Sequence, residues 1–548
     1  MPAAEDVFAA EKDVLLTGKD VFLCAEDVLL AAKDVFVAEK DVLVAGKDVF
    51  VCPEDVLDFK SDIIIRRLKV VPAGRAVKTV FQPALDAFAT EACVGAGLLA
   101  ACARIRFRQN KEATRAAVPP RRRTHPQTMK TFHEMPLDER LNLSHQQLER
   151  MRRPNGGYIA SPYTAEDGSG DAYNVFWIRD IMFATYANEY LGCFDKMVES
   201  FRLVLDIFKR YHARIIQASI IKPDVRHQTG QFMPARVHPT TLDTITDAWG
   251  HHQLDVYGLF MYKMGDLMKK GYGFRFKQED FFLISHIRNY IFNMGFEADY
   301  GMWEEGPEEH SSSFGAVLGG LMMWFDQGFY DYKYKHKIEI SHYVPISERM
   351  IADGFSSLAR VLPRESESRP YDMSQLSLIW PYNIVDYHTK KIILHNIETH
   401  LVGERGVRRY PHDVYCGKGL VPGENQTAEW PLGLAWLAIC YAKLAEHGRD
   451  FDIAHKPVHF DWHQRRAYFE KAVHYFEKLE KNMTPEGCVP EMYLGSVAGH
   501  NTPLAWAQSF HIISGQMLIN LSAAHPQEFK LPPEVRKRVN VPSVIYVQ

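Results

Sequence analysis

Apolar positions recur with the period of an α-helix over most of the chain beyond about residue 135. The helical stretches are separated by loops rich in Gly, Pro and aromatic residues, and strand-like character is confined to short β-branched pieces such as Lys391 to Leu394. The pattern predicts an all-α domain in which paired helices close into a ring, with the loops at one end converging on a site. The predicted helices cover approximately 178–192, 196–217, 250–269, 279–294, 313–328, 346–361, 374–384, 429–446, 463–480 and 504–522.

A seven-residue repeat occupies the first part of the chain, where Asp-Val-Phe or Asp-Val-Leu recurs from Asp6 to Asp55. The apolar residues of each copy are consecutive, so on a helix they would wrap around the axis instead of forming a seam. As a strand, the odd period would reverse the faces in every copy. We therefore interpret residues 1–58 as a low-complexity segment that carries no chemistry.

Residues 59–135 are predicted to form a partly basic, disordered linker. Their apolar run from Ala92 to Ala103 is shorter than the ~20 residues that a membrane-spanning helix needs. The basic stretch that ends at Arg123 lies too far along the chain for a transit peptide. The folded domain is therefore expected at 136–548.

The charge balance narrows the choice of partners. The chain has 64 Lys and Arg and 68 Asp and Glu, a formal net charge of −4, which argues against nucleic acid or an anionic membrane and favours a neutral ligand. Its eight Cys are scattered without a Cys-x-x-Cys pair, so neither a zinc ribbon nor a disulfide scaffold is predicted. With no N-terminal signal peptide visible, the cytoplasm is favoured. We expect no metal and no cofactor, and the oligomeric state stays open.

The stretch Asp299-Tyr-Gly-Met-Trp-Glu-Glu-Gly306 sets two adjacent carboxylates directly after an indole ring. Desolvation by Trp303 and repulsion by the Glu305 charge would both raise the pKa of Glu304, as a catalytic acid near neutral pH requires. The alternative is a solvated Glu-Glu pair at a turn, which is the ordinary surface role of Glu.

Other loops repeat this pairing of aromatic rings with charged groups. Arg179 and Asp180 follow Trp177, although a helix cap with an ion pair would explain them equally well. His251 and His252 follow Trp249, and adjacent helix positions point about 100° apart, so a metal pair there is not expected. Aromatic faces beside hydrogen-bonding carboxylates are what a pyranose ring needs.

The domain from about Leu141 to Ala524 resembles the (α/α)6-barrel family shared by the family 15 glycoside hydrolases, which are glucoamylase-like, and the α/β regulatory subunits of phosphorylase kinase. Each motif alone is weak, but six of them in the family's order are fairly specific. The matching pieces are Phe176-Trp-Ile-Arg-Asp180, Asp247-Ala-Trp-Gly250 with Asp255, Gly301-Met-Trp-Glu-Glu305, Arg408-Arg-Tyr-Pro411, Glu429-Trp-Pro431, and Pro490-Glu-Met-Tyr493 with Leu504-Ala-Trp-Ala507.

The resemblance implies an (α/α)6 barrel and inverting, exo-acting hydrolysis of α-glucosidic bonds in maltooligosaccharides or in glucans of the starch and glycogen type. Glu304 takes the place of the general acid and Glu491 that of the general base. The chain departs from fungal glucoamylases in its His251-His252 pair, shows no starch-binding module, and carries a Glu429-Trp-Pro motif closer to the kinase-subunit branch. The substrate-binding positions implied are Arg179, Asp180, Trp177, Trp249, Trp303, Glu305, Arg408, Glu429 and Trp506.

Two functions therefore stay open: a glucoamylase-like hydrolase, and a catalytically inactive glucan-binding or regulatory protein that uses the same cleft. For the hydrolase we expect Glu304 to have a pKa above the ordinary value of about 4.3, and Glu491 a normal or lowered one. In inverting enzymes the two carboxyls stand roughly 6.5–9.5 Å apart, with water between the base and the sugar.

Overall fold

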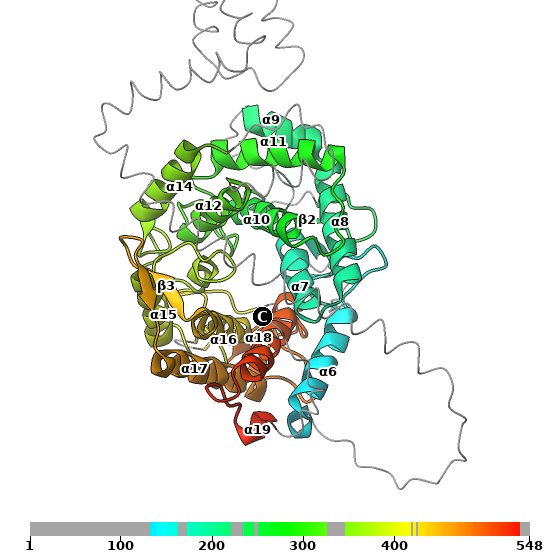
Figure 1. Cartoon of the computed structure of the whole chain (residues 1–548). Coiled ribbons are helices and arrows are strands. Elements are labelled where there is room, and N and C mark those ends of the chain that lie inside the picture. The colour runs from blue at the N-terminus through cyan, green and yellow to red at the C-terminus, as the bar shows by residue number, and fades with distance from the viewer. Residues whose placement is uncertain are drawn as a thin grey trace, which may run out of the picture. The chain divides into compact units, whose positions relative to one another are not determined.

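The computed structural model arranges helices in two concentric layers (Figure 1). It describes residues 132–162, 173–220, 233, 235–245, 250–325, 346–417, 420–423 and 426–536. The repeat at 1–58, nearly all of the predicted linker and Trp249 lie outside these residues.

Along the chain, an outer helix is followed by an inner one six times, which makes the described part an (α/α)6 barrel, as predicted. The outer layer contains α6 (Leu137–Glu149), α8 (Phe194–Arg210), α11 (Gln278–Met294), α14 (Glu348–Val361), α15 (Tyr387–His400) and α17 (Trp462–Lys481), with α9 (His212–Ile220) packed against α11. The inner layer contains α7 (Ile178–Tyr190), α10 (Leu254–Lys270), α12 (Ser311–Phe325), the 3-10 helix η3 (Met373–Leu378), α16 (Pro431–His447) and α18 (Ala505–Ala524). The short α19 (Pro533–Arg536) and the 3-10 turn η2 (Phe132–Glu134) complete the helices of the described residues.

The sequence of each helix matches its layer. Inner helices such as α7 and α16 are buried around almost their whole circumference, whereas the outer helices α8 and α14 bury one apolar stripe and expose a polar face. Gly258 lets α10 approach α12 closely, because a Cβ there would lie 2.3 Å from the carbonyl carbon of Ala316. The core therefore lies between the two layers and between neighbouring inner helices.

Four local predictions differ from the structure. The strand predicted at Lys391 to Leu394 is wrong, because this stretch lies inside the helix α15. The buried residues of α15 are spaced as on one face of a helix, and they are Lys390, Ile393, Leu394 and Ile397. The Asp386 carboxylate starts that helix by accepting hydrogen bonds from the backbone N–H groups of residues 388 and 389. The helix predicted at 374–384 is only the short 3-10 helix η3. The helix predicted at 196–217 is divided at Tyr211 into α8 and α9. The sequence pattern did not predict α6.

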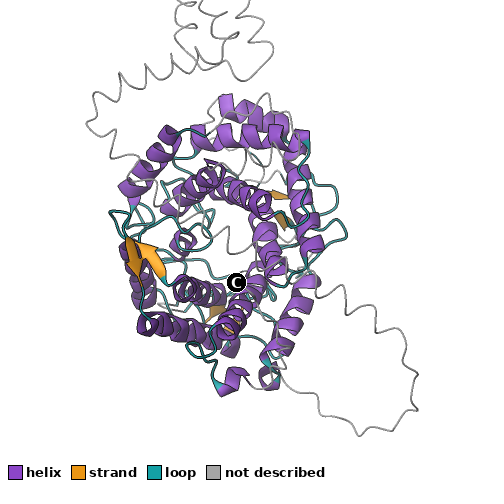
Figure 2. Ribbon diagram, viewed as in Figure 1, coloured by secondary structure: helices purple, strands orange, loops and turns teal. Residues whose placement is uncertain are grey.

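In the described part of the chain, three short strand pairs lie among the helices (Figure 2). β1 (Phe176–Trp177) pairs with β2 (Arg236–Val237) just before α7, and β5 (Tyr493–Leu494) pairs with β6 (Val497–Ala498) before α18. β3 (Arg449–Phe451) pairs with β4 (Pro457–His459) after α16. Because each inner helix is reached from an outer one, the inner helices begin at the same end of the barrel, and the loops that precede them meet there. In the part of the chain that the structure describes, no helix is both long and apolar enough to cross a membrane.

Candidate active site

Arg179, in the first turn of α7, is the buried centre of a hydrogen-bond network and is only 2% exposed. Its Nε donates to Oδ2 of Asp255 at 2.7 Å, its Nη2 to Oε1 of Gln253 at 2.8 Å, and its Nη1 to Oε1 of Glu304 at 2.7 Å. Gln253 and Asp255 stand at the start of α10, and Glu304 lies in the loop before α12. Arg179 therefore joins three separate segments, which a simple helix-cap role would not require.

Glu304 has a backbone φ of +60°, in the left-handed region that non-glycine residues rarely adopt. Burial raises the pKa of its carboxyl, and the Arg179 guanidinium opposes that rise. The predicted direction is confirmed, but one predicted cause is not, because the carboxylate that adds to the rise is Asp255. The charge of Glu305 is compensated by Arg369 and Arg409.

Glu491 is 1% exposed and accepts hydrogen bonds from three side chains. Its Oε1 accepts from the hydroxyls of Tyr173 and, at 3.1 Å, Tyr415, while its Oε2 accepts from Nδ2 of Asn501 at 2.8 Å. Burial nevertheless raises the pKa of Glu491, and the three donors only oppose the rise. The expectation of a normal or lowered pKa was wrong because it counted the need of a base for ionisation and ignored the cost of burying the charge.

Asp180 lies beside Arg179 at the start of α7 and is 8% exposed. Burial raises its pKa to about 7, with Arg179 opposing and the charges of Glu304 and Glu491 both adding to the rise. The charges of two carboxyls from two separate loops, Glu304 and Glu491, therefore both act on Asp180.

Trp303, Trp430 and Trp506 form an aromatic cluster beside these carboxyls. The ring of Trp303 is stacked on Trp506, with centroids 6.2 Å apart, and lies 6.1 Å from Trp430. Trp506 in turn stacks on Phe183 at 4.7 Å, with the rings almost parallel. The Arg236 guanidinium lies over the ring of Trp177, 5.1 Å from its centroid.

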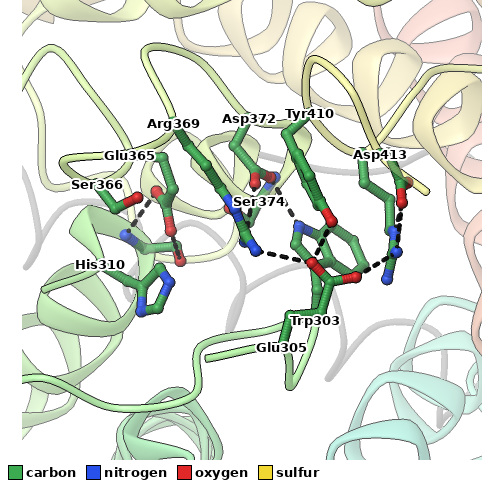
Figure 3. Close-up of polar contacts among 12 residues, drawn as sticks. Trp303, Glu305, His310, Glu365, Ser366, Arg369, Asp372, Ser374, Tyr410 and Asp413 are labelled. Atoms are coloured by element: carbon green, nitrogen blue, oxygen red, sulfur yellow. Dashed lines mark hydrogen bonds and ion pairs between the residues drawn. The ribbon is translucent and has the colours of Figure 1, made fainter. Parts of the chain in front are cut away.

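Glu305 ends in a cluster of cations and hydroxyls. Its carboxylate accepts hydrogen bonds from Nη2 of Arg369 at 2.8 Å, from Nη2 of Arg409 at 2.5 Å and from the Tyr410 hydroxyl (Figure 3). Arg409 also binds both oxygens of Asp413 at 2.7 Å. The guanidinium that enters the site from this loop is therefore that of Arg409.

Arg408 makes none of these contacts with the site, and its Nε is buried without a partner. Neighbouring residues of an extended segment point to opposite faces, so only one of two adjacent arginines can enter the site. The backbone of Val407 pairs with that of Trp430. This pairing keeps the segment extended, so that the side chains of Arg408 and Arg409 point to opposite faces.

Glu429 shows the same alternation beside Trp430. Its backbone pairs with Tyr493, and its Oε2 accepts from the backbone N–H groups of Arg405 at 2.7 Å and Gly406 at 3.2 Å. The contacts that this carboxylate makes are thus with the 403–406 turn, while Trp430 faces Trp303.

The structure thus brings Arg179, Asp180, Trp303, Glu304, Glu305, Glu491 and Trp506 together. Within the described residues no group of three or more His, Cys, Asp or Glu is arranged to hold a metal ion. Arg409 and Asp413 are four residues apart in the sequence, a spacing that could have revealed their pairing, but nothing local marks Asn501 or Asp372. The residues that sequence analysis did not select are Tyr173, Gln253, Asp255, Arg369, Asp372, Arg409, Asp413, Tyr415 and Asn501.

The fold defines a glucoamylase-like (α/α)6 barrel. Residues 136–324 match the family model of glycosyl hydrolases family 15, so the resemblance predicted from the motifs is confirmed. A solved glycosidase in complex with glucose superimposes with a TM-score of 0.52 at 18% identity, covering 70% of this chain and 97% of its own. The glucoamylase of Saccharomycopsis fibuligera gives a TM-score of 0.50 at 15% identity, covering 71% of this chain and 95% of its own.

The chain is also similar to regulatory subunits of a kinase. A probable phosphorylase b kinase regulatory subunit alpha of Caenorhabditis elegans is 26% identical over 295 residues, which cover 48% of this chain and 23% of the relative. The liver isoform of the alpha subunit of Mus musculus is 24% identical over 340 residues, covering 55% of this chain and 26% of the relative. The matched part thus spans about a quarter of these relatives' own length.

Proposed function

We propose that this protein is an inverting, exo-acting glycoside hydrolase of glucoamylase type, with Glu304 as general acid and Glu491 as general base. The observation that carries the proposal is that both carboxyls act on the same residue, Asp180. The charge of Glu304 and the charge of Glu491 each raise the pKa of Asp180. Each of the two is held by fixed donors, Arg179 on Glu304 and Tyr173, Tyr415 and Asn501 on Glu491.

The reaction follows from the chemistry of the two carboxyls. Glu304 gives its proton to the glycosidic oxygen while the bond from that oxygen to C1 breaks. Glu491 takes a proton from a water molecule whose oxygen forms the new bond to C1 on the opposite face, so the product has inverted configuration. Each carboxyl then returns to its starting state by exchanging a proton with solvent.

The surroundings of the carboxyls favour a glucose unit as the group that is bound. The stacked rings of Trp303 and Trp506 offer flat apolar faces, and Arg179 and Asp180 offer hydrogen-bonding groups. A nearly neutral net charge of −4 fits an uncharged α-glucan. We assign Trp249, which lies outside the described residues, to a stacking role on the strength of its motif alone.

The second candidate function is a catalytically silent, glucan-binding regulatory protein. The similarity to phosphorylase b kinase regulatory subunits favours it. The ion pair between Arg179 and Glu304 at 2.7 Å adds support, because a cation at this distance stabilises the ionised form of the proposed acid.

The deciding experiment is to incubate the purified protein with maltotriose and maltopentaose and to follow the products by proton NMR. The hydrolase should release β-glucose from the non-reducing end, and the double variant Glu304→Gln with Glu491→Gln should release none. Binding of the same oligosaccharides is measured in parallel by calorimetry. If the protein binds the oligosaccharides but releases no glucose at any pH from 4 to 8, the hydrolase function is wrong and the regulatory function takes its place.

A further inference from the structure

The segment 365–372, called here the clamp segment, is fixed at both of its ends. The backbone oxygen of Glu365 accepts from the N–H of Ser311 at 2.7 Å, and its carboxylate accepts from the Ser311 hydroxyl at 2.7 Å. Ser311 begins α12, and its hydrogen bond to Glu365 opposes the rise that burial causes in the pKa of this carboxyl. At the other end, Oδ1 of Asp372 caps η3 by accepting from the N–H of Ser374 at 2.7 Å.

From this fixed segment, two side chains reach the loop that carries the proposed acid (Figure 3). Oδ1 of Asp372 accepts a hydrogen bond from Nε1 of Trp303 at 2.8 Å. Nη2 of Arg369 donates to Oε2 of Glu305 at 2.8 Å, and its Nη1 lies 3.5 Å from Oδ2 of Asp372. The residues immediately before and after Glu304 are therefore both held by the clamp segment.

Glu304 itself needs such support because of its backbone conformation. A φ of +60° costs a non-glycine residue about 1–2 kcal/mol and persists only where the surrounding structure enforces it. If Trp303 and Glu305 were free, the loop would relax toward negative φ. The carboxyl of Glu304 would then turn away from Arg179.

The burial of Asp372 points to the same role. This carboxylate is fully buried, and its desolvation costs more free energy than the cap of a six-residue 3-10 helix requires. A serine could cap η3 equally well. Asp372 additionally supplies the acceptor for the indole N–H of Trp303, which would otherwise be a buried unsatisfied donor.

We propose that Asp372 and Arg369 are positioning residues that hold Trp303 and Glu305 and thereby aim the carboxyl of Glu304. Neither residue touches the reacting atoms. What the inference says about acid catalysis rests on the proposed function, whereas what it says about the conformation of the loop does not.

The structural part is tested by hydrogen exchange of the peptide that contains residues 301–306 in the full-length protein. Exchange should be at least tenfold faster in Asp372→Ala and Arg369→Ala. It should stay near the wild-type rate in Asp372→Asn, which keeps an acceptor oxygen. Arg360→Ala is the matched control, because it removes an ion pair with Glu309 that is about half exposed. Unchanged exchange in both alanine variants would overturn the proposal. If Asp372→Ala does not fold, the exchange rate of Arg369→Ala alone tests it.

The catalytic part compares two substrates. In Asp372→Ala and Arg369→Ala, kcat on maltotriose should fall at least tenfold, while kcat on α-glucosyl fluoride should fall less than threefold, because departing fluoride needs little help from an acid. Asp372→Asn should recover most of the maltotriose activity. Equal losses on both substrates would show that the clamp segment does not act through the acid. If exchange responds as expected but the wild type hydrolyses neither substrate, the hydrolase function fails and the positioning of the loop stands.

Discussion

Nη1 of Arg179 lies 2.7 Å from Oε1 of Glu304, so the proposed acid faces a buried cation. The same guanidinium binds Asp255, and the charge of Arg409 also opposes the rise in the pKa of Glu304. Arg179 therefore compensates the buried Asp255 and the partly buried Glu304 at once, and desolvation still leaves the pKa of Glu304 raised.

Replacement of Arg179 is expected to destabilise the fold more than it would at a surface ion pair. Arg179→Met should lower the free energy of unfolding by about 3–5 kcal/mol, because it leaves buried carboxylates without a partner. Arg360→Met, which removes a half-exposed pair, should cost less than about 1 kcal/mol. Urea unfolding followed by circular dichroism measures both. A loss below 1 kcal/mol for Arg179→Met would mean that water compensates the carboxyls instead.

The roles of the two catalytic candidates separate on substrates that differ in leaving group. Glu304→Gln should lose hydrolysis of maltooligosaccharides but keep much of the activity on α-glucosyl fluoride. Glu491→Gln should lose both, because no group would then activate the water. Steady-state kinetics on the two substrates give the comparison. Equal loss on both substrates in Glu304→Gln would remove that residue from the acid role.

The layered fold was predictable because its signal is periodic and repeated along the chain. Apolar spacing marked most of the helices that form the barrel, and six motifs in order pointed to the family whose model residues 136–324 match. The strand prediction at Lys391 to Leu394 failed because β-branched residues can lie on the buried face of a helix when a cap such as Asp386 starts it.

The site was only partly predictable, because side-chain direction is decided by contacts between distant loops. Trp303 and Glu304 stand out in the sequence, but the preference for Arg409 over Arg408 depends on the pairing of Val407 with Trp430. Asp372 lies 69 residues from Trp303, and no local pattern connects them.

The domain boundary is expected to lie just before Phe132, a few residues earlier than the sequence pattern suggests. Phe132 is fully buried, with its ring centroid 6.2 Å from that of His511 in α18. A fragment that begins at residue 130 should therefore have the melting temperature of the full chain, whereas Phe132→Ala in the same fragment should cost about 3–5 kcal/mol. Calorimetry of the two fragments gives the answer. A lower melting temperature of the unmutated fragment would mean that earlier residues contribute to the barrel.

Asp180 should make stability depend on pH. Its pKa is about 7 in the folded protein against an ordinary 3.8, so between these values the folded state keeps a proton that the unfolded state has lost. Stability is therefore lost as pH rises through this window. Asp180→Asn removes the effect, so relative to wild type the variant should gain more than about 1 kcal/mol between pH 4.5 and pH 8, since one pKa unit is worth about 1.4 kcal/mol. Urea unfolding at both pH values measures the gain, and a difference that does not change with pH would contradict the prediction.

Glu429 is expected to support the loop and not the substrate, although its motif suggested binding. Its partly buried carboxylate accepts hydrogen bonds from two backbone N–H groups of the 403–406 turn, and losing this acceptor costs about 1–3 kcal/mol. Glu429→Ala should therefore lower the melting temperature while leaving KM for maltotriose within about twofold below the transition. Glu404→Ala is the control, since that side chain is 84% exposed and its removal should change neither quantity. An unchanged melting temperature with a strongly raised KM would return Glu429 to the substrate-binding residues, because only a direct contact with the sugar could then explain the loss.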